Sequence, residues 1–298
     1  MWIEITVAAA FMQNFRSALQ KRLTSDLSTT GATFVRFGFG LPFAGLYLLL
    51  LHSVDYAIPA PDETFLWYVL LASLSQIAGT ALLVLAFSYR NFMAATVYSK
   101  TEPIVAALFG FLILGDTLAL PGLVAIGVGL LGVAAMSIGD RGTLRQMVRS
   151  SSLPSAAIGL SSGVGFAISG IAVRGAALSL GTADPVAQAA LTLVCVIALQ
   201  TVLMVVFIVL VEVATFRAIL RVWKVALATG FCGAAASIGW FTAMALQPVA
   251  LVKTVGQIEL VFAYLASIWW FRESISRKEL LGCALVILAV LILIRSGS

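Results

Sequence analysis

Two glutamates, Glu102 and Glu259, lie within long apolar stretches of the sequence. A charged side chain in the hydrocarbon of a membrane costs about 2.5–3.5 kcal/mol on insertion scales, so each carboxylate needs a partner or a wet cavity. One hypothesis is a site for a substrate amine or for a proton. The alternative is a buried structural pair, with Lys100, Lys253 or a backbone donor as partner. The residues alone leave both open.

Further polar residues occur at helical spacing near the glutamates. Lys253 and Gln257 are four residues apart and share one helix face, as do Thr96 and Lys100. These four residues are predicted to line a polar cavity near the middle of the membrane, suited to a carboxylate. The alternative is that they form hydrogen bonds with neighbouring helices, which is common in membrane bundles.

Amide and aromatic side chains extend the candidate site. The amides could bind substrate or join helices, and the aromatic rings could form an apolar wall for a bulky side chain or pack against other helices. Arginines at positions 16 and 174 are expected either to snorkel to the interface or to be buried. The predicted substrate-binding residues are Gln13, Asn14, Gln76, Thr96, Tyr98, Lys100, Phe166, Trp240, Lys253, Gln257 and Tyr264, with Glu102 and Glu259 as coupling or structural carboxylates.

The composition indicates the elements that position these residues. Of 298 residues, 61% are hydrophobic and only 10% are charged, whereas a soluble domain carries about 25% charged residues. A membrane-spanning helix needs about 20 apolar residues. The sequence therefore predicts an all-α membrane protein with ten transmembrane helices, at roughly 2–22, 31–51, 65–88, 93–114, 121–138, 154–178, 185–211, 222–245, 249–271 and 278–294.

The two halves of the sequence repeat. The offset from Glu102 to Glu259 is 157 residues, and the offset from Asp116 to Glu273 is the same. Five helices per half would insert in opposite senses, the inverted-repeat plan of many secondary transporters. The expected organisation is a first five-helix repeat at 1–138, a cytoplasmic linker at 139–153 and a second repeat at 154–298. Predicted helices 1, 3, 4, 6, 8 and 9 would line the cavity.

Lysine and arginine predict the orientation. They concentrate after the odd-numbered predicted helices, whereas the opposite side has only Arg295. The positive-inside rule places the basic loops in the cytoplasm and both termini on the non-cytoplasmic side of the cell (inner) membrane. The same rule accounts for the net charge of +5 without a nucleic-acid partner.

Enzymatic chemistry has little support in the sequence. The single histidine, His52, is expected in an outside loop, far from the serines of Gly159-Leu160-Ser161-Ser162-Gly163, and a nucleophilic serine needs a nearby base. The three cysteines are scattered, with no metal-binding spacing. We therefore expect no enzyme, no metal and no cofactor.

The repeated segments resemble a known family. Glu102-Pro103 is followed by an apolar run to Gly115-Asp116, and Gln257-Ile258-Glu259-Leu260 by a run to Phe271-Arg272-Glu273. A glycine-containing helix follows each, at 121–138 and 278–294, and Arg36 lies near the start of the second predicted helix. With these features the chain resembles the EamA-type, ten-helix members of the drug/metabolite transporter superfamily over its whole length.

The resemblance implies the export or exchange of small metabolites, and it is greatest to the amino-acid exporter branch. Two departures are Asp116, where the family usually has glutamate, and the lack of a proline after Glu259. The expected function is a monomeric secondary transporter that moves amino acids outward by alternating access, aromatic or bulky apolar ones among them. The alternatives are an exporter of drugs or other amphipathic metabolites and, in a different class, a channel or membrane scaffold.

Overall fold

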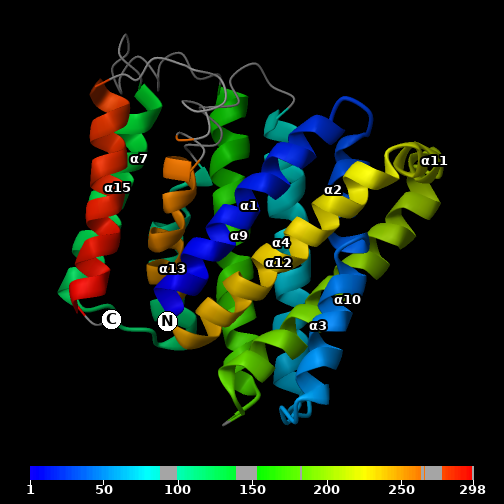
Figure 1. Ribbon diagram of the computed structural model, residues 1–298, viewed down its shortest axis with the longest axis horizontal. Coiled ribbons are helices and arrows are strands. Elements are labelled where there is room, and N and C mark those ends of the chain that lie inside the picture. The colour runs from blue at the N-terminus through cyan, green and yellow to red at the C-terminus, as the bar shows by residue number, and fades with distance from the viewer. Residues whose placement is uncertain (88–98, 139–152, 182, 263–264, 266–276, 297–298) are drawn as a thin grey trace.

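The computed structural model describes residues 1–87, 99–138, 153–181, 183–262, 265 and 277–296 (Figure 1). The regular secondary structure of this part of the chain is helical, and no strand occurs in it. The helices are α1 (Trp2–Leu23), α2 (Thr29–Gly38), α3 (Leu41–Ser53), α4 (Glu63–Phe87), α6 (Glu102–Phe109), the π-helix η1 (Gly110–Leu114), α7 (Leu120–Ile138), α9 (Leu153–Ser179), α10 (Pro185–Val211), α11 (Ala214–Arg221), α12 (Trp223–Leu246), α13 (Val249–Gly256) and α15 (Arg277–Ser296).

Six helical segments of the described residues are long and apolar enough to cross a membrane. The shorter apolar helices Glu102–Leu114 and Leu120–Ala135 add to them. The predicted helices at 93–114 and 249–271 extend into residues that the structure does not describe, and the full count of ten stays a prediction. The six segments are Thr29–Ser53, Glu63–Leu85, Ala157–Ser179, Pro185–Val211, Trp223–Leu246 and Arg277–Ser296.

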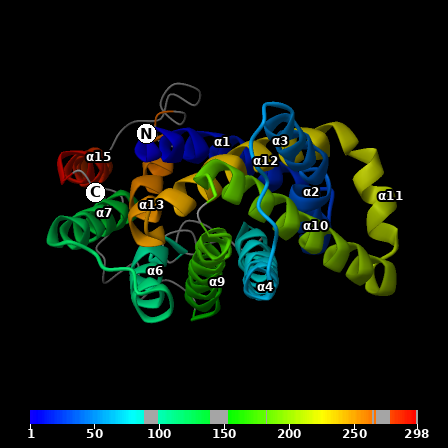
Figure 2. The same cartoon turned by 90° about the horizontal axis from the view of Figure 1, so that it is seen from below.

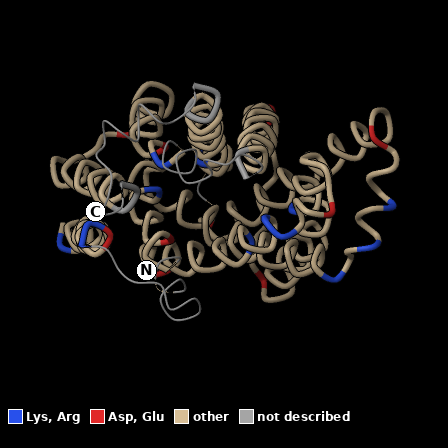
Figure 3. The backbone as a smooth tube through the Cα atoms, turned by 90° about the horizontal axis from the view of Figure 1, so that it is seen from above, with Lys and Arg blue, Asp and Glu red and all other residues tan. Residues whose placement is uncertain are grey.

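Two features differ in detail from the sequence-based expectation. The helix predicted at 31–51 is divided into α2 and α3, because Pro42 in the first turn of α3 cannot donate the backbone hydrogen bond that would continue α2. The segment Ala214–Arg221, expected as a loop, forms the short helix α11. Basic residues mark the outer end of the molecule at this helix, while most of the chain carries no charge (Figure 3).

The most extensive helix contacts join the two halves of the chain. Helix α4 packs against α9, α1 against α12, and α7 against α15. Figures 1 and 2 both show α7 and α15 side by side at one end of the molecule. Because every one of these pairs combines a helix before residue 138 with one after residue 153, neither half forms its core alone.

Small residues allow the closest of these contacts. A Cβ added at Gly165 in α9 would lie 3.1 Å from the Cα of Gly79 in α4, so the two backbones nearly touch. The hydroxyl of Ser162 donates a hydrogen bond to the carbonyl oxygen of Gly79 at 2.9 Å. Without a hydrophobic effect between helices in lipid, such close packing and interhelical hydrogen bonds supply much of the stability.

The outer surface of the helices is strongly apolar. Leu49 is 66% exposed, Trp67 65% and Leu210 77%. Exposed apolar surface on this scale would cause a soluble protein to aggregate. Together with the six apolar helices of the described residues, it indicates a multi-pass membrane protein.

A cluster of side-chain hydrogen bonds joins the start of α2 to the turn between α10 and α11. The Glu212 carboxylate accepts hydrogen bonds from Ser28 at 2.9 Å, Thr30 at 3.0 Å and Thr215 at 3.1 Å. The Ser28 hydroxyl, assisted by those of Thr30 and Thr215, lowers the pKa of the Glu212 carboxyl, although partial burial opposes this. Ser28 also caps α2 by accepting from the backbone N–H of Gly31.

The break between α2 and α3 yields a stability prediction. A Cβ at Gly230 of α12 would lie 2.4 Å from the backbone carbonyl carbon of Phe39, which a side-chain rotation cannot relieve. Gly230→Ala should therefore cost about 1–3 kcal/mol of stability, the range for overpacking. The measurement is the midpoint of thermal unfolding in detergent.

The matched control is Gly127→Ala in α7, where nothing lies within 4 Å of the added Cβ. It should leave stability unchanged or raise it by roughly 0.4–1 kcal/mol, because alanine loses less backbone entropy on folding than glycine does. Equal unfolding midpoints for the two variants would contradict the close contact between α12 and Phe39.

Candidate functional site

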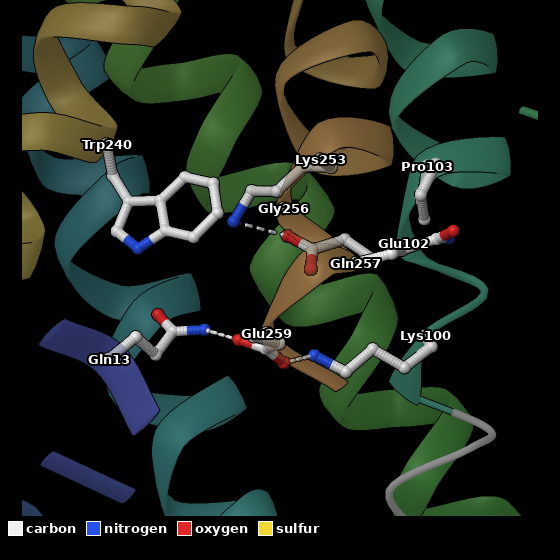
Figure 4. A pocket seen from close by; sticks show the side chains of 9 residues that line it. All are labelled: Gln13, Lys100, Glu102, Pro103, Trp240, Lys253, Gly256, Gln257 and Glu259. Carbon is white, nitrogen blue, oxygen red and sulfur yellow. Dashed lines mark hydrogen bonds and ion pairs between the residues drawn. The ribbon is translucent and has the colours of Figure 1, made fainter. Parts of the chain in front are cut away.

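A small cavity lies between helices of the two halves, among α1, α6, α12 and α13 (Figure 4). Its volume is about 20 Å³. A cavity needs roughly 10–15 Å³ on this scale to hold one water molecule. In this conformation it has room for little more than that. Its lining consists of Gln13, Lys100, Glu102, Pro103, Trp240, Lys253, Gly256, Gln257 and Glu259.

Glu259 is held by several groups at once. Its carboxylate forms an ion pair with Lys100 and accepts a hydrogen bond from Gln13 Nε2 at 2.6 Å. Asn14 Nδ2 donates to the main-chain oxygen of Glu259 at 2.8 Å. These contacts connect α1, the residues before α6 and the residues after α13. The Glu259 carboxylate is therefore anchored on two sides.

Glu102 has a simpler environment. Its Oε1 lies 2.8 Å from Lys253 Nζ. The two groups form an ion pair, but their geometry is not that of a hydrogen bond. The Lys253 ammonium also lies 4.8 Å from the centre of the Trp240 ring. An aromatic face attracts a cation at this distance. Lys253 thus has a second favourable contact that does not depend on Glu102.

The two ion pairs cross between the halves. Lys100 of the first half pairs with Glu259 of the second, and Glu102 of the first half pairs with Lys253 of the second. Figure 4 shows the two pairs one above the other, with Trp240 and Gln13 on the side opposite Lys100. All four charged side chains are therefore neutralised only when both halves are in place.

Two buried polar side chains of the lining have unused hydrogen-bonding groups. Among the described residues, Trp240 Nε1 and both the oxygen and the nitrogen of the Gln257 amide lack a hydrogen-bond partner. Gln257 is 2% exposed and Trp240 6%. An unsatisfied buried polar group costs about 1–3 kcal/mol. Both side chains belong to the lining of the cavity and carry this cost in the conformation described.

Glycines make room for both side chains. A Cβ at Gly256 would lie 2.4 Å from Cη2 of Trp240, and one at Gly129 would lie 2.4 Å from Oε1 of Gln257. Gly256 and Pro103 belong to the lining but were not among the predicted binding residues. A glycine directly before Gln257 was the available sequence signal for a bulky neighbour.

The remaining predicted binding residues lie elsewhere. Gln76 accepts a hydrogen bond from Gln200 Nε2 at 2.8 Å and so joins α4 to α10. Phe166 packs against Gly79 at the contact between α4 and α9. Neither lines the cavity. The predictions for Thr96, Tyr98 and Tyr264 lie outside the described residues.

The arginines within the helices have little exposed surface. Arg174 Nε donates to Asp116 Oδ2 at 3.1 Å, Nη2 donates to Oδ1 at 3.1 Å, and Nη1 donates to the carbonyl oxygen of Met244 at 2.9 Å. Arg36 Nη1 donates to Thr80 Oγ1 at 2.8 Å. Arg16 is 3% exposed. The Asp116–Arg174 pair joins the segment between η1 and α7 to α9, outside the cavity.

Comparison with known proteins agrees with this architecture. Residues 1–138 match the EamA-like transporter family. A comparison with curated proteins found no match. A solved structure titled "Crystal structure of protein" matches with a TM-score of 0.69 and 16% sequence identity, over 98% of this chain and 94% of that chain. At this identity the likeness shows the fold alone, but it extends through the second half, beyond the residues of the family match.

The two carboxylates should differ in their effect on stability. Glu259→Gln removes the ion-pair partner of Lys100, whereas Glu102→Gln leaves Lys253 with the face of Trp240. Removing one partner of a buried ion pair costs roughly 3–5 kcal/mol. We expect Glu259→Gln to lower the thermal unfolding midpoint more than Glu102→Gln does.

The control is the double variant Glu259→Gln, Lys100→Met, which removes the unpaired cation together with its partner. It should recover part of the lost stability, because a buried pair can often be replaced by apolar groups at little cost. A larger loss from Glu102→Gln than from Glu259→Gln would contradict the stronger anchoring of Glu259.

Proposed function

We propose that this protein is a secondary transporter that carries small molecules across a membrane by alternating access. The observation that carries the proposal is the charged cavity, which lies between two halves of a helical membrane protein and is lined by both. Binding sites between two repeats, near the middle of the membrane, are typical of secondary transporters. The match of residues 1–138 to a transporter family supports the same function.

The pattern of helix contacts supports an inverted repeat of ten helices. If α1 corresponds to α9 and α4 to α12, exchanging the halves converts the α1–α12 contact into the α9–α4 contact. Under the same exchange α7 corresponds to α15, so the α7–α15 contact is converted into itself. All three are the most extensive contacts in the described structure. A pseudo-twofold axis relating repeats 1–138 and 154–298 requires this reciprocity.

The size of the cavity supports a transporter over an open channel. A conducting pore needs a continuous path, whereas this cavity of about 20 Å³ has room for little more than a water molecule. We interpret the conformation as a closed state, from which the repeats must move to admit a substrate. A membrane scaffold would have no use for buried, unsatisfied polar atoms around a central cavity.

For the substrate we propose amino acids, with aromatic or bulky apolar ones favoured by the Trp240 ring beside Lys253. Export is the direction suggested by the resemblance to the amino-acid exporter branch. Drugs and other amphipathic metabolites are the alternative cargo. We further propose a monomer in the cell (inner) membrane, with both termini on the non-cytoplasmic side.

Flux in proteoliposomes tests the function directly. The purified protein, reconstituted with labelled amino acids, should give saturable flux that an excess of unlabelled substrate inhibits, because each transport cycle binds a limited number of molecules. Protein-free liposomes are the control. Flux that rises linearly with concentration and behaves as a conductance would instead support a channel, and inhibition by amphipathic drugs alone would support the alternative cargo.

Cysteine labelling tests the orientation. Ala60 lies between α3 and α4, and Ser25 lies between α1 and α2, and both are exposed. In a background with Cys195, Cys232 and Cys283 replaced, a membrane-impermeant reagent added to intact cells should label Ala60→Cys and spare Ser25→Cys. Ser25→Cys should react once the membrane is permeabilised. The reverse pattern would overturn the proposed orientation.

A further inference from the structure

The charges around the cavity sum to zero. Lys100 and Lys253 contribute two positive charges, Glu102 and Glu259 two negative ones, and each lysine is paired with a glutamate. The four side chains are only 11–17% exposed. In such surroundings an uncompensated charge costs several kcal/mol. Any ligand that enters must therefore leave every charge with a partner.

The two ion pairs differ in how easily they can open. Glu259 is held by both Lys100 and Gln13, and Asn14 fixes its main chain. Among the described residues, Glu102 forms its one ion pair with Lys253, without a directed hydrogen bond. Lys253 keeps the face of Trp240 when Glu102 moves away. The Glu102–Lys253 pair is therefore the one that a ligand can separate at lower cost.

The net charge of the ligand decides what this separation costs. An anion placed on Lys253 would release Glu102 without a partner, and a cation placed on Glu102 would release Lys253. A zwitterion supplies one group for each, so that two ion pairs replace one and no charge is left unpaired. The electrostatics of the site thus favour a zwitterion over an anion or a cation, whatever the side chain of the ligand is.

We propose that a zwitterionic ligand inserts between Lys253 and Glu102, with its carboxylate on the Lys253 ammonium and its own ammonium on the Glu102 carboxylate. This inference rests on the proposed transport function and makes it specific to one pair of residues. Lys100 and Glu259 keep their contacts and form the fixed wall of the site.

The unused hydrogen-bonding groups fit this arrangement. Gln257 belongs to the lining and is 2% exposed; its amide packs beside Gly129 of α7 without a hydrogen-bond partner among the described residues, so it can turn to a ligand without breaking a hydrogen bond. The donor suits a carboxylate oxygen and the acceptor suits an ammonium hydrogen. The Trp240 ring next to Lys253 offers an apolar surface to the rest of the ligand.

A panel of matched compounds tests the proposal. Leucine, phenylalanine and tryptophan are each supplied as the free amino acid, as the carboxamide and as the N-acetyl derivative. At about pH 6 these are zwitterions, cations and anions respectively. Two measurements are made on the full-length protein: inhibition of flux in proteoliposomes, and the shift in thermal unfolding midpoint on adding each compound.

For the wild-type protein we expect at least one free amino acid to bind roughly tenfold or more tightly than both of its singly charged derivatives, the scale of one lost charged hydrogen bond. Equal binding of all three charge forms would overturn the inference while leaving transport intact. Absence of flux with every compound would instead overturn the proposed function, and the inference with it.

Substitutions then invert the selectivity. Glu102→Gln leaves Lys253 as the uncompensated charge and should shift the preference toward the N-acetyl anion. Lys253→Met leaves Glu102 and should shift it toward the carboxamide cation. If the pair had a purely structural role, each substitution would weaken the binding of all three charge forms equally in folded protein. That result would overturn the proposal.

The matched control is Asp116→Asn, which removes the carboxylate of the Asp116–Arg174 pair outside the cavity. The Asp116 side chain is 12% exposed and that of Glu102 13%, so the two losses of charge are comparable. We expect lower stability but an unchanged ranking of the three charge forms. If Asp116→Asn changed the ranking as much as Glu102→Gln does, the selectivity would not depend specifically on the Glu102–Lys253 pair.

Discussion

A charged side chain that moves from water into a membrane loses a hydration energy that hydrocarbon cannot replace, so it must find its compensation inside the protein. In this protein the compensation is reciprocal between the halves. Lys100 and Glu102 belong to one half, and their partners Glu259 and Lys253 belong to the other. The helices that bear these residues are therefore held against one another by electrostatics at the centre of the bundle.

The packing around this centre depends on small residues. Gly79 with Gly165, Gly129 with Gln257, and Gly256 with Trp240 are contacts in which a methyl group would collide with a neighbour. The first two bring the two halves close together, and the third packs α13 against α12 within the second half. The cavity is consequently small, and its charged side chains are only 11–17% exposed.

Much of this organisation could be predicted from hydropathy and proline positions. The structure begins and ends α10 at the predicted residues, because Pro185 and the polar segment after Val211 bound a long apolar run. Hydropathy carries no information on the kink at Pro42, since the residues on both sides of it are apolar. Helix α11 was missed because eight amphipathic residues resemble a charged loop.

The candidate site was predicted in part. The constant offset pointed to Glu102 and Glu259, and the two lysines were foreseen as possible partners. Which lysine pairs with which glutamate depends on the relative positions of α6 and α13, which no local pattern encodes. For the same reason the amide of Gln76 could not be assigned to Gln200 rather than to the cavity. The difference between the two carboxylates arises from Gln13 and Asn14, more than 240 residues away in the sequence.

The crossed pairing has a consequence for biosynthesis. A chain is made from its N-terminus, so Lys100 and Glu102 enter the membrane well before Lys253 and Glu259 have been translated. The ion-pair partners of both residues, Glu259 and Lys253, belong to the second half. The nascent first half must therefore keep these charges near water or the translocation machinery until the ninth predicted helix arrives. Burial of the charged centre becomes a late step of assembly, completed only when almost the whole chain has been synthesised.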